Sequence, residues 1–354
     1  MTRGHRSWTL LVRALLPLSL AGSLEAGAAE RYAVTPLPFF NTRGGALSNN
    51  GVVTAGMVNP DGSVALGEWS GGVLNKLGTA SELPPKFNKV RPFGINSLGA
   101  IVGTIYTSAG EVPARAFIYS GGKFNVLPLV EPTDLGGTAI GINDNGQVVG
   151  YDKASDGEQG WLWSNGAYAR LPVSGVSTVA FGINSSGTIV GNRTFGLLQR
   201  LFTGCCEGAR GYVVSHGTTQ YLDGFVNAIN DRGEAAGASS SASSGHATVF
   251  RNGVASTILS LPSSAVGINS SGDVVGSYQP PGSSSHVFVW KADSGAVDLT
   301  PAGYRYAMAA AIDKHDDVLG FGETTGGRFE YFLLTPDPSG ALVPKRLSAP
   351  LASR

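Results

Sequence analysis

Residues 141–150 read GINDNGQVVG, and this stretch recurs along the chain. The other copies are, in chain order, ALSNNGVVTAG from Ala46, GINSLGAIVG from Gly94, GINSSGTIVG from Gly182, AINDRGEAAG from Ala228, GINSSGDVVG from Gly267 and AIDKHDDVLG from Ala311. The second residue of each copy is apolar: Leu47, Ile95, Ile142, Ile183, Ile229, Ile268 and Ile312, with spacings of 48, 47, 41, 46, 39 and 44 residues. Seven copies at this period indicate a repeat architecture, and we number the repeats one to seven from these anchors.

A second, apolar half follows each copy. In repeat three it reads GWLWSNG (Gly160–Gly166) and then YARLPV (Tyr168–Val173). Trp161 and Trp163 are two residues apart, so both project from one face of an extended strand. The Asn-x-x-Gly sequence inside a copy favours an Asx-type bend followed by a glycine with positive φ, as a tight hairpin needs. Each repeat therefore predicts four short strands, and such a unit every ~40–50 residues is typical of a propeller blade.

The predicted fold is all-β: a seven-bladed β-propeller of four-stranded antiparallel blades, closed by the N-terminal strand. The segment RYAVTPLPFF (Arg31–Phe40) resembles the fourth strand of a blade and is expected to pair with the last blade. That blade's own strands are predicted at EYFLLTP (Glu330–Pro336) and ALVPKRL (Ala341–Leu347). An open stack of sheets is the alternative, but closure leaves only short strand edges exposed.

The repeat resembles the HAF repeat family, whose pattern is A-x-x-I-N-D-x-G-x-V-V-G followed by H-A-F-L-W-x-x-G. Residues 141–150 match the first half and WLWSNG (Trp161–Gly166) matches the second. The naming triplet is imperfect; it comes closest at Arg115-Ala116-Phe117, His246-Ala247-Thr248 and His286-Val287-Phe288. The resemblance implies a bacterial, extracellular repeat protein. The family carries no established activity, so no catalytic residues are carried over from it.

Composition and the N-terminus predict an exported protein. Residues 1–28 combine three arginines, the apolar run ALLPLSLA and Ala26-Gly27-Ala28, as a secretory signal does; residues 29–354 then form a single propeller domain. The apolar run is too short to span a bilayer, which needs ~20 residues. With 25 basic and 25 acidic side chains, no nucleic-acid footprint is present. We expect a secreted protein, extracellular or periplasmic, with no membrane insertion and no nucleic-acid partner.

Repeat seven contains the one acidic turn, Asp313-Lys314-His315-Asp316-Asp317. Closely spaced carboxylates in a hairpin loop can hold Ca²⁺, which takes oxygen ligands. Asp313, His315, Asp316 and Asp317 are therefore a candidate calcium site, with a solvated turn as the alternative that we prefer. His246 and His286 begin the aromatic strand in successive repeats and could share a metal ion, although a repeated structural hydrogen bond is the preferred interpretation. No cofactor is otherwise expected.

The two cysteines, Cys205 and Cys206, are adjacent and lie in the insertion LLQRLFTGCCEGARG of repeat four. In an oxidising compartment free thiols do not persist easily. A vicinal disulfide that rigidifies a projecting loop is one interpretation, and bonds to other chains are another.

The sequence contains no Ser-His-Asp order, nucleophile elbow, His-Glu-x-x-His helix or phosphate loop. We therefore expect a binding or scaffolding module whose ligand is a glycan, an envelope polymer or a protein, rather than an enzyme. The alternative is an extracellular hydrolase or lyase that acts on polysaccharide with carboxylates near the propeller axis, because such carboxylates leave no local motif. A structural matrix protein without a small ligand is a third possibility.

Overall fold

The computed structural model describes residues 30–40, 44–108, 110, 112–194, 210–239 and 245–347. The predicted signal segment and both cysteines, Cys205 and Cys206, lie outside these residues. Among the described residues, no helix is long and apolar enough to cross a membrane. They form short β-strands, with one short 3₁₀ helix at Ala80–Glu82.

The strands follow the repeats. The N-terminal strand and repeats one to three form β1 (Tyr32–Phe40), β2 (Gly45–Leu47), β3 (Val53–Val58), β4 (Val64–Ser70), β5 (Val73–Gly78), β6 (Lys89–Ile95), β7 (Ile101–Tyr106), β8 (Arg115–Ser120), β9 (Lys123–Val126), β10 (Gly137–Ile142), β11 (Val148–Ala154), β12 (Gly157–Ser164) and β13 (Ala167–Arg170). Repeats four and five form β14 (Ser177–Ile183), β15 (Ile189–Thr194), β16 (Arg210–Ser215), β17 (Thr218–Leu222), β18 (Phe225–Ile229), β19 (Ala235–Ala238), β20 (Ala247–Arg251) and β21 (Val254–Thr257). Repeats six and seven form β22 (Ser263–Ile268), β23 (Val274–Tyr278), β24 (His286–Lys291), β25 (Gly295–Asp298), β26 (Tyr304–Ile312), β27 (Val318–Thr324) and β28 (Phe329–Pro336), and β29 (Lys345–Arg346) follows them.

Hydrogen bonding divides the described strands into six sheets. Three are four-stranded antiparallel meanders: β10–β13, β14–β17 and β18–β21. A fourth contains β22–β25 with β29 added, and a fifth has the order β1-β28-β27-β26. The sixth has eight strands, in which the meanders β2–β5 and β6–β9 are joined by one parallel residue pair, Val64 with Lys89.

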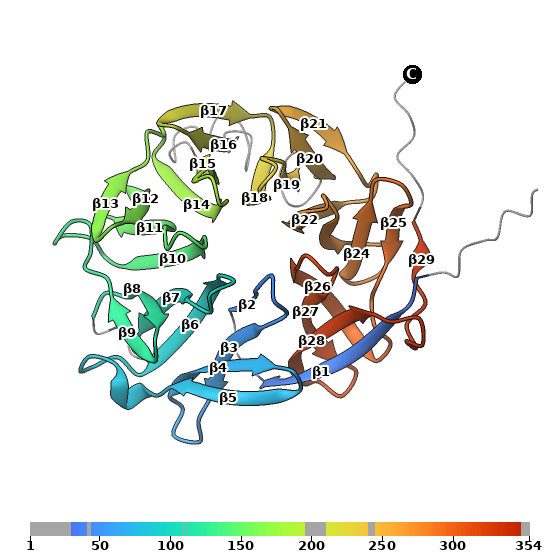
Figure 1. Cartoon of the computed structure of the whole chain (residues 1–354), viewed down its shortest axis with the longest axis horizontal. Coiled ribbons are helices and arrows are strands. Elements are labelled where there is room, and N and C mark those ends of the chain that lie inside the picture. The colour runs from blue at the N-terminus through green and yellow to red at the C-terminus, as the bar shows by residue number, and fades with distance from the viewer. Residues whose placement is uncertain are drawn as a thin grey trace, which may run out of the picture.

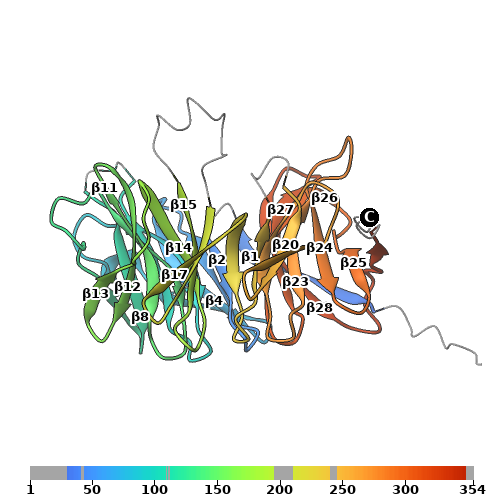
Figure 2. The same ribbon diagram turned by 90° about the horizontal axis from the view of Figure 1, so that it is seen from above.

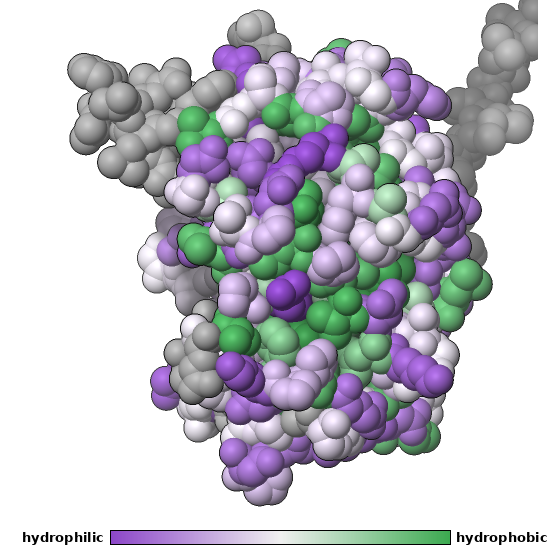
Figure 3. All heavy atoms as spheres, turned by 90° about the vertical axis from the view of Figure 1, so that its left-hand side faces the viewer, coloured by the Kyte–Doolittle hydropathy of each residue, from purple (hydrophilic) through white to green (hydrophobic). Residues whose placement is uncertain are grey.

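The sheets stand side by side around a common axis (Figure 1). The first strand of each repeat is innermost, and each inner strand contacts the next: β2 contacts β6, and so on to β26, which contacts β2. In the edge-on view the strands run between the two faces of a disc (Figure 2). Figure 3 shows one side of the outer edge of the disc, where apolar residues lie in patches among polar ones.

The core is divided into layers between neighbouring sheets. Val148 and Val149 of repeat three are both fully buried, although successive strand residues point to opposite faces. Val148 packs in a cluster with Val102 of repeat two, and Val149 packs in another with Ala180 of repeat four. The apolar pair of the repeat is therefore explained by a sheet that is covered on both faces.

The glycine that ends the Val-Val-Gly sequence lies at a β-bulge. Ala139 pairs with Gly150, but Gly141 already pairs with Val149, so Ile140 is the extra residue. A Cβ on Gly150 would lie 2.0 Å from the Thr138 carbonyl oxygen. Only glycine allows the backbones to approach this closely, as is common at bulges.

The N-terminal strand completes the last sheet, as the sequence predicted. β1 pairs antiparallel with β28, from Tyr32 opposite Pro336 to Leu37 opposite Tyr331. Phe39 of β1 is fully buried and packs in a cluster that includes Val53 of repeat one. β1 therefore connects the last repeat to the first.

The prediction of a last-sheet strand at residues 341–347 was wrong. In that segment only Lys345 and Arg346 form a strand, β29, and they pair with β25 of the preceding sheet. The reason is that β1 occupies the edge of β28, so the C-terminal segment passes to the open edge of β25. An isolated antiparallel bridge between Leu342 and Tyr32 marks where it crosses β1.

Candidate functional site

The asparagine of each Ile-Asn sequence has two roles. In repeat three, Asn143 Oδ1 accepts hydrogen bonds from the backbone N–H groups of Asn145 at 3.1 Å and Gln147 at 3.0 Å. This is the Asx-type bend that the sequence predicts. The amide Nδ2 of Asn143 donates to the carbonyl oxygen of Asn184 in the next repeat, at 2.9 Å. One buried side chain thus shapes its own turn and holds the neighbouring repeat.

These amide bonds form a ladder around the axis, which we call the asparagine ladder. Its five bonds run from Nδ2 to the carbonyl oxygen of the next repeat: Asn96 to Asn143 at 3.1 Å, Asn143 to Asn184 at 2.9 Å, Asn184 to Asn230 at 3.1 Å, Asn230 to Asn269 at 2.9 Å, and Asn269 to Asp313 at 3.1 Å. All five asparagines are buried. This ladder was not predicted from the sequence. Serine or aspartate can also form the bend, so the recurrence of asparagine was the available sign that the amide has a second role.

Small residues before the anchor bring the inner strands close enough for the ladder. A Cβ on Gly94 would lie 2.6 Å from the Ile140 carbonyl oxygen of the next repeat. A Cβ on Gly267 would lie 3.3 Å from the backbone nitrogen of Ile312. Glycine at the start of Gly-Ile-Asn thus allows the close packing of strands near the axis.

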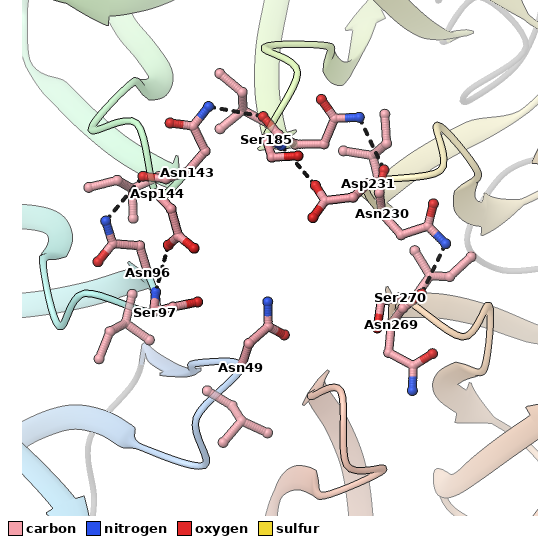
Figure 4. Close-up of a pocket in the computed structure, with 17 residues that line it drawn as sticks. Asn49, Asn96, Ser97, Asn143, Asp144, Ser185, Asn230, Asp231, Asn269 and Ser270 are labelled. Carbon is pink, nitrogen blue, oxygen red and sulfur yellow. Dashed lines mark hydrogen bonds between the residues drawn. The ribbon is translucent and has the colours of Figure 1, made fainter.

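The ladder surrounds a cavity of about 180 Å³ at one face of the disc (Figure 4). We call this cavity the axial mouth. Its wall contains six of the anchors and the five ladder asparagines. Its rim consists of the residues that follow the ladder position in repeats one to six: Asn49, Ser97, Asp144, Ser185, Asp231 and Ser270. All six are polar, and all except the half-buried Ser97 are exposed.

Two rim carboxylates are held by the preceding repeat. Asp144 Oδ1 accepts the backbone N–H of Ser97 at 2.8 Å, and Asp231 Oδ1 accepts that of Ser185 at 2.8 Å. In Figure 4 both carboxylates and the Asn49 amide lie toward the opening. The rim thus presents positioned carboxylate, hydroxyl and amide groups to anything that enters the mouth.

The acidic turn of repeat seven lies next to the mouth. Asp313 is fully buried, with Oδ1 accepting the N–H groups of His315 and Asp317 at 2.8 and 3.0 Å. Asp316 Oδ2 accepts a hydrogen bond from Lys291 Nζ at 2.7 Å, and its Oδ1 accepts one from Asn269 Nδ2 at 2.7 Å. Lys291 also binds Glu30 at 3.0 Å. Within the described ranges, no three His, Cys, Asp or Glu side chains gather as a metal-binding group.

The two candidate histidines have separate partners. His246 Nδ1 lies 3.2 Å from the Leu261 carbonyl oxygen, and His286 Nδ1 lies 3.2 Å from Asp298 Oδ2. Each therefore makes a local contact within its own repeat. The partners differ, a backbone carbonyl in one and a carboxylate in the other, so the predicted hydrogen bond is not a repeated one.

No family model matches this chain, and the search of curated proteins found no match. Solved structures do resemble it. The β-propeller domain of the Trilobed protease from Pyrococcus furiosus, described as having an open velcro topology, has a TM-score of 0.56 and 10% identity over 92% of this chain and 99% of that one. A Mycobacterium tuberculosis puromycin-hydrolyzing peptidase has a TM-score of 0.60 and 12% identity over 92% of this chain. The acylaminoacyl peptidase of Pyrococcus horikoshii has a TM-score of 0.52 and 12% identity over 86% of it.

The chain spans 57% and 51% of the lengths of these two peptidase chains. At such low identity the likeness shows the fold alone: the chain has an all-β, propeller-like fold. In contrast to the open topology described for the Pyrococcus furiosus domain, β1 here completes the last sheet by pairing with β28.

Proposed function

We propose that this chain is a secreted, seven-bladed β-propeller of the HAF-like type that works as a binding module, with its ligand at the axial mouth. Seven repeats and a continuous ring of contacting inner strands support seven blades. The eight-stranded sheet is compatible with this count, since only one residue pair joins its two meanders. Residues 1–28 would direct the chain to the periplasm or the extracellular space.

The rim of the axial mouth is the observation that carries the proposal. Six successive repeats each place a polar residue at the same position of the turn, around one cavity. The ladder beneath them is buried and hydrogen-bonded, so the rim groups are held before a ligand arrives. Such preorganisation lowers the entropic cost of binding.

We propose a glycan as the ligand class. Asn49, the rim serines and the two rim aspartates offer donors and acceptors together, as sugar hydroxyl groups require. The mouth, at about 180 Å³, is smaller than the ~300–1,000 Å³ pockets that enclose drug-sized ligands. It therefore fits the terminal unit of a glycan or envelope polymer better than a whole small molecule.

The rim chemistry favours binding over hydrolysis. A glycosidase needs an acid and a base or nucleophile on either side of the scissile bond. Asp144 and Asp231 are the carboxylates of the rim, and each already accepts a backbone N–H from the turn of the preceding repeat. A hydrolase or lyase remains the alternative, and product analysis during the binding experiment tests it.

The test is a glycan and envelope-polysaccharide array with residues 29–354, followed by titration of any ligand found. Asp144→Asn and Asp231→Asn keep an oxygen for the Ser97 and Ser185 N–H groups but remove the negative charge. Each should weaken binding by about tenfold or more, because a hydrogen bond to a charged group contributes ~1.5–3 kcal/mol. Asp156→Asn, at an exposed turn between β11 and β12, is the control and should bind as the wild type does.

Three outcomes would contradict the proposal. If the protein binds no glycan on the array, a glycan ligand is rejected. Binding that neither rim variant weakens would place the ligand outside the mouth. Release of shortened saccharides by the wild type, but not by the rim variants, would identify an enzyme.

A further inference from the structure

The asparagine ladder joins repeats two to seven and has no bond on either side of repeat one, whose ladder position is Ser48. The junction between repeats seven and one differs further in its charge. At this junction the ladder residue is Asp313, which has a carboxylate oxygen where repeats two to six have the amide Nδ2. Its Oδ1 forms the bend, as Oδ1 of the asparagines does. By equivalence, Oδ2 takes the place of Nδ2 and faces repeat one. There the equivalent acceptor is the carbonyl oxygen of Ser48, to which a carboxylate oxygen without a proton cannot donate a hydrogen bond.

Asp313 is also a buried carboxyl group whose Oδ2 lacks a hydrogen-bond donor. The side chain is 0% exposed, and Oδ2 has no hydrogen-bond partner. The nearest cationic group is His315 Nδ1 at 3.5 Å, on a side chain that is 60% exposed. A buried carboxylate oxygen in this state is costly unless a cation or a proton reaches it.

A second carboxylate converges on the same place. The space beside Gly51 where a Cβ would lie is 3.8 Å from Asp317 Oδ2 and 4.0 Å from Asp313 Oδ2. Gly51 N–H itself donates to the Ser48 carbonyl oxygen at 3.1 Å. Two carboxylate oxygens of repeat seven therefore border a gap that Gly51 leaves free of side chain. The Ser48 carbonyl oxygen of repeat one is placed beside Asp313 Oδ2 by equivalence with the other ladder bonds.

The nearby lysines do not fill this gap. Lys291 is engaged by Asp316 and Glu30. Lys314, the rim-position residue of repeat seven, is exposed and contacts Asn50 Oδ1 at 3.4 Å. Neither forms a hydrogen bond or ion pair with Asp313 or Asp317 among the described contacts.

We propose that a calcium ion binds between Asp313 and Asp317 of repeat seven and the Ser48 carbonyl oxygen of repeat one, and thereby joins the two repeats where the ladder cannot. These are hard oxygen donors of the kind calcium prefers, and calcium accepts water for the rest of its six to eight ligands. The ion would link the same two repeats that β1 joins at the outer edge of the last sheet. This inference is independent of the ligand at the axial mouth.

The test uses residues 29–354 after removal of metals, with the melting temperature measured in chelator, in CaCl₂ and in MgCl₂. Extracellular calcium sites bind at ~10⁻⁴–10⁻³ M, so about 10 mM CaCl₂ should approach saturation. We expect the melting temperature to rise by roughly 3–5 °C in calcium and less in magnesium. Isothermal titration calorimetry with CaCl₂ should give one site per chain.

Asp313→Asn introduces the asparagine that repeats two to six have at this position. This variant should fold, equal or exceed the metal-free wild type in stability, and lose the calcium response. Asp317→Asn should also lose the response. Asp273→Asn is the matched control, because Asp273 holds the position of Asp317 in repeat six, beside the intact Asn269 amide; it should respond as the wild type does.

The absence of both a melting shift and calorimetric heat in the wild type would overturn the proposal. A shift that persists in both Asp313→Asn and Asp317→Asn would place the ion elsewhere. Because these readouts use no glycan, failure of the glycan array does not affect them.

Discussion

Asp152 shows how a single buried residue departs from the pattern of the repeat. It is fully buried, Oδ1 accepts the Trp161 indole N–H at 2.9 Å, and Oδ2 accepts the Val130 N–H at 2.7 Å. Asp134, itself buried, is a second carboxyl group beside it. Burial, with Asp134 adding to it, raises the pKa of Asp152 from its ordinary value near 3.8 to about 6.

This pKa predicts a pH dependence of stability. The folded state favours protonated Asp152, so its contribution is fully present below pH ~4 and is lost as the pH rises to ~6. Asp152→Asn removes the titration. The wild-type free energy of unfolding, minus that of the variant, should fall by about 2 kcal/mol between pH 4 and pH 7.

Urea denaturation at a series of pH values measures this difference. Asp156→Asn, on an exposed turn of the same sheet, should leave the pH dependence of the wild type unchanged. A constant difference between wild type and Asp152→Asn across this range would show that Asp152 does not take up a proton on folding.

Between elements, the asparagine ladder predicts that neighbouring repeats lose stability when one amide is removed. Asn96 accepts N–H bonds from Leu98 at 3.1 Å and Ala100 at 2.8 Å, and it donates to Asn143 in the next repeat. Asn96→Ala leaves these buried or half-buried groups unpaired, at a cost of about 2–3 kcal/mol. Leu98→Ala, in the same turn but exposed, should change the free energy of unfolding by less than ~0.5 kcal/mol. Equal effects of the two substitutions in chemical denaturation would contradict the role of the ladder.

How far the sequence predicted these elements depends on whether a feature is local. The bend after Ile142 and the four strands of each repeat follow from residue periods and turn chemistry, and both were predicted. The bond from Asn143 to Asn184 joins residues 41 positions apart, and no local pattern states where the amide points. The strand at residues 341–347 was misplaced for a related reason: edge pairing depends on which edge is free, and β1 had taken that of β28.

The axial mouth was predicted only in part, for the same physical reason. From the sequence, the axis was considered only as the place of carboxylates in the alternative hydrolase, and the rim residues Ser97, Asp144 and Ser185 are ordinary turn residues in their own repeats. They become a site only when the inner strands gather around one axis. The acidic turn was visible in the sequence, whereas the gap beside Gly51 depends on repeats one and seven meeting across 262 residues, from Gly51 to Asp313.

At the scale of the whole molecule, the first and the last described segments of the chain pair with each other beside the last sheet. Tyr32 and Leu342 exchange two backbone hydrogen bonds, at 3.0 and 3.1 Å, and their segments run antiparallel. A short linker can therefore connect residue 343 to residue 30 without moving either segment. A circular permutant that starts at Gly44, ends its original sequence at residue 343 and then carries residues 30–40 keeps every pairing between β1 and β28.

This permutant should fold and melt within roughly 5 °C of residues 29–354, because the β1–β28 pairing and the burial of Leu37 and Phe39 are retained while only the two-residue strand β29 is lost. Residues 44–343 without β1 expose the edge of β28 and remove Phe39 from the layer between the last repeat and the first. Loss of a buried Phe alone costs ~3–5 kcal/mol, so this shorter chain should melt far lower or aggregate through the open edge. Differential scanning calorimetry of residues 29–354, the permutant and residues 44–343 measures the three melting temperatures. If the shorter chain melts as the permutant does, the stability of the ring depends on the contacts of its inner strands alone, and β1 is an accessory strand rather than its closure.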